Sequence, residues 1–104
     1  MNAIENQVRE LVAVELEAAN ERFPQFHSAH EGYAVIREEF EEMKEQMEAA
    51  EIFLRYMWND VKANNPAKVS AETMMDISVD AACEAIQVAA MCKKFLEMEG
   101  RMNE

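Results

Sequence analysis

The stretch ISVDAACEAIQVAAMC, residues 77–92, has very few polar side chains, and this property decides the fold that the sequence predicts. Its polar residues are Ser78, Asp80, Glu84 and Gln87. A helix that is hydrophobic nearly all round is normally covered by other helices. At 100° per residue, Asp80, Glu84 and Gln87 share one narrow sector. Carboxylates in an apolar wall are costly unless they are paired or bound to metal, so Asp80 and Glu84 need a compensating group.

The spacing of apolar residues predicts four helices along the chain. They cover about residues 2–22, the segment that starts after Ser28, residues 51–64 and residues 70–99. No strand pattern, internal repeat or low-complexity tract interrupts them, and half of the residues are hydrophobic. We therefore expect residues 1–104 to form a single all-α domain with a protomer that resembles a four-helix bundle. The apolar last helix exposes too much surface for a monomer of this size, so we also expect oligomerisation.

Helix boundaries are predicted from capping and breaking residues. Pro24 ends the first helix. Ser28 with Glu31 has the spacing of a capping box, in which each side chain satisfies an amide of the new helix. Ser70 is expected to cap the last helix, and Gly100 to follow its end.

Composition and charge restrict the classes of partner. Acidic residues outnumber basic ones by 21 to 10, which gives a formal charge of −11. This surface should repel nucleic-acid phosphates and anionic membranes, so we expect no partner of either kind. The first ten residues, MNAIENQVRE, are charged where a signal peptide would be apolar, and no later segment is long and apolar enough to span a bilayer. The predicted location is the cytoplasm.

The glutamate-rich stretch IREEFEEMKEQME, residues 36–48, separates into two acidic groups when it is placed on a helix. One group faces solvent and consists of Glu41, Glu45 and Glu48. The other borders the apolar stripe and consists of Glu38, Glu39 and Glu42. Only the second group could meet the acidic sector of the last helix.

Carboxylates from two facing helices form a site of hard oxygen ligands, which suits Mg²⁺ or Mn²⁺. Bundles of helices hold metal ions in this way in other carboxylate proteins. Two alternatives stay open. A glutamate-rich helix is commonly a solvated face, and a buried Asp or Glu commonly accepts hydrogen bonds from Ser, Tyr or Lys.

The sequence resembles a known superfamily at these same residues. Residues 38–42, EEFEE, fit the EExxE motif of the MazG-like, all-α nucleoside triphosphate pyrophosphohydrolases, and EAIQ at residues 84–87 resembles the ExxD motif that follows it. The likeness covers roughly residues 23–97, and this stretch looks like the short members found in phages and prophages. It implies a helical bundle that forms homodimers or homotetramers. It also implies Mg²⁺-dependent cleavage of a nucleoside triphosphate into the monophosphate and pyrophosphate.

The resemblance implies roles for some residues, and side-chain chemistry suggests others. By the resemblance, Glu38, Glu39, Glu42 and Glu84 are predicted metal ligands. Asp80, which shares a helix face with Glu84, is predicted as a further ligand that replaces the motif Asp for which Gln87 stands. Glu39 or Glu42 would take the proton from the attacking water. The predicted substrate contacts are Lys62, Trp58 and Gln87. Other candidates for contacts with phosphates or the base are Lys68, Lys93, Arg55 and Tyr33.

Two other functions are compatible with the sequence. Because Gln87 replaces an acid of the motif, the chain could be a catalytically impaired relative that binds nucleotides or a protein partner. The net charge alone supports the other alternative, an acidic protein that mimics nucleic-acid charge.

Overall fold

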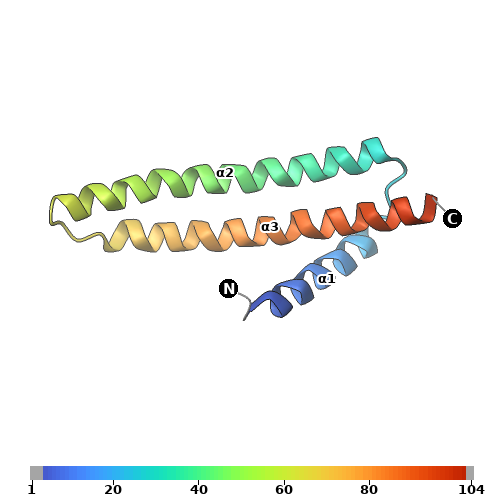
Figure 1. Ribbon diagram of the computed structural model, residues 1–104, viewed down its shortest axis with the longest axis horizontal. Coiled ribbons are helices and arrows are strands. Elements are labelled where there is room, and N and C mark those ends of the chain that lie inside the picture. Colours follow the sequence, from blue (N-terminus) through green and yellow to red (C-terminus); the bar gives the residue numbers. More distant parts are fainter. Residues whose placement is uncertain (1–3, 103–104) are drawn as a thin grey trace.

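The computed structural model describes residues 4–102, and this part of the chain contains three helices. They are α1 (Glu5–Arg22), α2 (Ala29–Lys62) and α3 (Lys68–Met102). Helices α2 and α3 run antiparallel along their whole length as a long hairpin, and α1 packs against one half of α3 (Figure 1). The all-α prediction is confirmed. Within the described residues, no helix combines the length and the apolar character that crossing a bilayer requires.

The prediction of four helices was wrong, because its second and third helices form the single helix α2 of 34 residues. Between residues 33 and 62 there is neither glycine nor proline, and residues 43–51 are mostly strong helix formers. Asn64 ends the helix with a φ of 57°, a left-handed conformation that asparagine tolerates better than most residues. The connection to α3 is therefore the short turn that the sequence suggested.

The capping predictions had different outcomes. Half of the predicted capping box is present, because Ser28 Oγ accepts a hydrogen bond of 3.1 Å from the Glu31 amide. The Glu31 carboxylate instead contacts His27 Nδ1 at 2.9 Å. Ser70 does not cap α3, which begins two residues earlier at Lys68. The Ser70 hydroxyl instead donates to Asp60 Oδ2 at 3.4 Å, which joins the two helices beside their turn. At the other end α3 continues through Gly100 to Met102.

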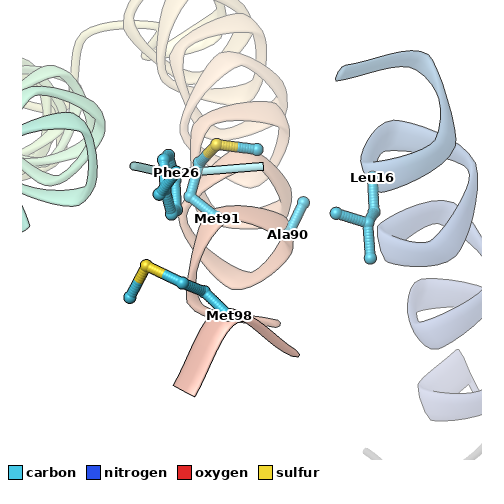
Figure 2. Close-up of a cluster of buried hydrophobic side chains, with 5 residues drawn as sticks. All are labelled: Leu16, Phe26, Ala90, Met91 and Met98. Carbon is cyan, nitrogen blue, oxygen red and sulfur yellow. The ribbon is translucent and has the colours of Figure 1, made fainter. Parts of the chain in front are cut away.

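The core lies along the second half of α3, which packs against α2 on one side and against α1 on another. Its buried residues are Leu16, Phe26, Ala90, Met91 and Met98. Ala90 faces Leu16 of α1, whereas Met91 and Met98 lie on the side of α3 toward α2 (Figure 2). The expectation that other helices cover α3 all round is not met within this chain. Its exposed apolar side chains are Val69, Met75, Val79 and Leu96.

Gly32 is buried in α2 at the closest approach between this helix and the core. A Cβ atom at this position would lie 2.6 Å from Cδ2 of Phe95 and 2.9 Å from Cδ2 of Phe26. We expect Gly32→Ala to lower the free energy of unfolding by about 1–3 kcal/mol, because the rings must move.

Urea denaturation checks this prediction, with Gly100→Ala as the matched control. Gly100 is also helical, but nothing lies within 4 Å of its added Cβ. The control should therefore gain stability, by up to about 1 kcal/mol, from helix propensity alone. Equal effects of the two substitutions would contradict the packing argument.

Candidate functional site

Three carboxylates converge where α2 and α3 face each other. Glu39 and Glu42 lie three residues apart on one face of α2, and Glu84 lies on the opposite stretch of α3. One carboxylate oxygen of each lies within 4.8 Å of the others. The structure thus brings together Glu39 and Glu42 of the first motif with Glu84 of the second.

Burial and mutual repulsion raise the pKa of two members of this cluster. For Glu39, partial burial contributes most, followed by the charges of Glu42 and Glu84 and more weakly by those of Glu38 and Glu15. The pKa of Glu84 is raised by desolvation, and by the charge and hydrogen bonding of Glu42. Neighbouring carboxylates contribute to both shifts, so their charges disfavour full ionisation of the cluster.

Glu38 and Asp80 lie beside the cluster but do not join it. Both side chains are exposed. Their charges reach it, since Glu38 helps to raise the pKa of Glu39 and Asp80 that of Glu84. Their role as metal ligands stays a prediction.

A cavity of about 460 Å³ lies next to the cluster, between α1 and the α2–α3 hairpin. Glu39 belongs to both the cluster and the cavity wall, and Gln87, one of the predicted substrate contacts, also lines it. Most of the remaining wall is apolar or aromatic. The other side chains that line it are Glu15, Ala18, Ala19, Arg22, Phe23, Pro24, Phe26, Glu31, Val35, Met91 and Lys94.

Glu15 and Lys94 were not predicted as site residues, although their positions in the sequence indicate an unusual environment. Glu15 lies between Val12 and Ala19 on the apolar stripe of α1, and Lys94 lies between Met91 and Met98 on that of α3. A charged residue inside an apolar stripe either faces a cavity or needs a partner. In the folded chain both line the cavity.

The other two predicted substrate contacts lie at the far end of the hairpin. Lys62 Nζ is 5.6 Å from the centroid of the Trp58 ring, a cation–π contact between neighbours on α2. On one continuous helix, Trp58 follows Glu42 by 16 positions and Lys62 follows it by 20. They therefore lie about 24 Å and about 30 Å from Glu42 along the helix axis. Within one chain they do not meet the cluster.

Comparisons with models of protein families, with curated proteins and with solved structures each found no match. The resemblance to MazG-like enzymes therefore depends on the motif residues. Among the described residues the cluster offers three carboxylates without a nitrogen or sulfur donor, a set that could hold a hard divalent cation such as Mg²⁺ or Mn²⁺.

Proposed function

We propose that this chain is a Mg²⁺-dependent pyrophosphohydrolase that converts a nucleoside triphosphate into its monophosphate and pyrophosphate. The observation that carries the proposal is the convergence of Glu39, Glu42 and Glu84 from two motifs at one end of a cavity. The volume of this cavity falls in the range of small-molecule sites, about 300–1,000 Å³. Because the three carboxylates raise one another's energy when they are charged, binding of a divalent cation would be favourable.

Each residue has a defined part in this proposal. Glu39, Glu42 and Glu84 would hold Mg²⁺, which neutralises phosphate charge and polarises the leaving group when it is bound. Because Glu39 also lines the cavity, its carboxylate would accept the proton of a water that attacks the α-phosphorus. Pyrophosphate would leave with the electron pair of the broken bond between the α-phosphorus and the bridging oxygen.

A second candidate function has its own support in the geometry. The Asp of the ExxD motif is replaced by Gln87, and Asp80, its expected substitute, is exposed and outside the cluster. Three carboxylates instead of the five predicted would hold the cation less firmly. The alternative is therefore an impaired relative that binds a nucleotide without cleaving it.

Pyrophosphate release from a panel of ordinary and modified nucleoside triphosphates, with Mg²⁺ or Mn²⁺, tests both functions. The enzyme requires release that depends on the metal, together with a higher melting temperature when the metal is present. A stabilising shift without release would favour the binding protein. If neither is seen, both functions are rejected.

We also propose that the chain functions as a homodimer or homotetramer. Helix α1 covers one half of the hairpin and leaves the half near the turn as two helices only (Figure 1). This bare half is rich in exposed apolar side chains, namely Ile52, Leu54, Tyr56, Trp58, Val61, Val69, Met75 and Val79. A second copy that packs there would complete a four-helix bundle.

A further inference from the structure

Lys94 is a buried lysine with few partners. The residue is only 2% exposed. Its Nζ donates one long hydrogen bond of 3.4 Å to the Phe23 carbonyl oxygen and lies 4.9 Å from the centroid of the Phe26 ring. None of the ion pairs found among the described side chains involves it. An ammonium group has three donors, and lysine is rarely buried unpaired. Lys94 Nζ can therefore donate a further hydrogen bond to an acceptor atom of a ligand.

The cavity that Lys94 lines has two chemically different ends. Glu39 and Gln87 mark the acidic end, next to the three-carboxylate cluster. Lys94 marks the other end, together with Phe23 and Phe26. Gln87 and Lys94 are seven residues apart on α3, which corresponds to about 10 Å along the helix. A ligand that fills the cavity thus meets carboxylates at one end and a lysine among aromatic rings at the other.

The surroundings of Lys94 favour a neutral acceptor over a phosphate. The Phe23 carbonyl oxygen lies beside Nζ, and the Glu31 carboxylate lines the same cavity. Both would repel a phosphate, which would also have to lose its water among apolar side chains. Arg22, the other cation that lines the cavity, is exposed to solvent, so its charge is screened. A planar ring with a carbonyl oxygen next to an N–H group fits better, because the oxygen can accept from Nζ and the N–H can donate to a carbonyl or carboxylate oxygen.

We propose that the Lys94 end of the cavity binds a nucleobase and selects bases with a carbonyl oxygen next to a ring N–H, as in uracil, thymine and guanine. Lys94 Nζ donates the hydrogen bond that selects them. Cytosine and adenine carry an amino group at the corresponding position, which meets the ammonium as a second donor. The inference rests on the proposed function only for placing the phosphates at the acidic end.

Isothermal titration with non-cleavable α,β-imido analogues of UTP, GTP, CTP and ATP, in the presence of Mg²⁺, measures this selection without turnover. We expect the UTP and GTP analogues to bind about tenfold or more tightly than the other two, which is the usual discrimination of one well-placed base contact. In Lys94→Met this preference should fall below about threefold, because the donor is lost while the apolar stem remains. Lys44→Met, at an exposed position of α2 outside the site, is the control and should keep the preference.

Melting temperature separates a ligand contact from a structural role. Removing a buried, poorly paired charge should leave the melting temperature of Lys94→Met unchanged or higher. A lower melting temperature with an equal loss of all four affinities would overturn the inference, as would equal binding of the four analogues, or no binding, by the unsubstituted protein. Pyrophosphate release without base preference would overturn this inference alone. Selective binding without release would overturn only the enzymatic function.

Discussion

Glu39→Gln will lower Mg²⁺-dependent pyrophosphate release by at least about 100-fold, the usual loss when a general base is removed. Glutamine keeps the size of the side chain but cannot accept a proton from water, and it offers one weaker ligand oxygen. Glu39 is also the residue that belongs to both the carboxylate cluster and the cavity. Glu41→Gln, an exposed glutamate outside the cluster, is the control and should retain full activity. An active Glu39→Gln variant would remove this residue from the mechanism.

The same substitution should stabilise the metal-free protein at neutral pH. The folded chain raises the pKa of Glu39 above its ordinary value of 4.5, through burial first and then the charges of Glu42 and Glu84. Above that value the folded state binds more protons at Glu39 than the unfolded state does, so stability falls as pH rises through the raised pKa. Glutamine removes this penalty.

Thermal melting in a chelator from pH 4 to pH 8 checks the sign of this effect. Glu39→Gln should melt at a higher temperature than the unsubstituted protein at pH 7, and the difference should shrink toward pH 4. Added Mg²⁺ should raise the melting temperature of the unsubstituted protein more than that of the variant. A variant that is less stable at pH 7 would show that Glu39 makes a favourable structural contact instead.

The sequence predicts the helical class and one capping residue well because these depend on local chemistry. Apolar spacing is a property of each helix, and Ser28 needs only the amide three residues later. The length of α2 was missed because a separate helix was predicted from residue 51, although no residue at that position stops a helix. Ser70 was misassigned because a serine near a helix start has two uses, and its contact with Asp60 across the turn is not local.

The candidate site shows the same division. Glu39, Glu42 and Glu84 were predictable because each occupies a defined face of its helix, and an antiparallel hairpin brings the two faces together. The cavity was not predictable, since it depends on the angle at which α1 packs on α3. Contacts made only in the folded chain, such as Leu16 against Ala90, set that angle (Figure 2). The proposed role of Lys94 depends on this cavity, so it was not predictable either.

The double variant Leu54→Glu/Met75→Glu will dissociate the oligomer. Both side chains are more than half exposed in the single chain, at 51% and 61%, and both lie in the half of the hairpin that α1 leaves bare. A glutamate buried in an apolar interface loses its water without gaining a partner, so two of them should weaken association by well over tenfold. Sedimentation equilibrium at micromolar concentration measures the mass against the 11.9 kDa of one chain.

Leu96→Glu is the control for this experiment, because Leu96 is 67% exposed on the half of α3 that α1 covers. It should keep the mass of the unsubstituted protein, and equal dissociation would show that the interface extends beyond the bare half. A monomeric unsubstituted protein would reject the assembly altogether. The cluster carboxylates all come from one chain, so the dissociated variant should still be stabilised by Mg²⁺. If pyrophosphate release is lost nevertheless, residues of a second chain, such as Lys62 and Trp58 from its hairpin end, complete the site.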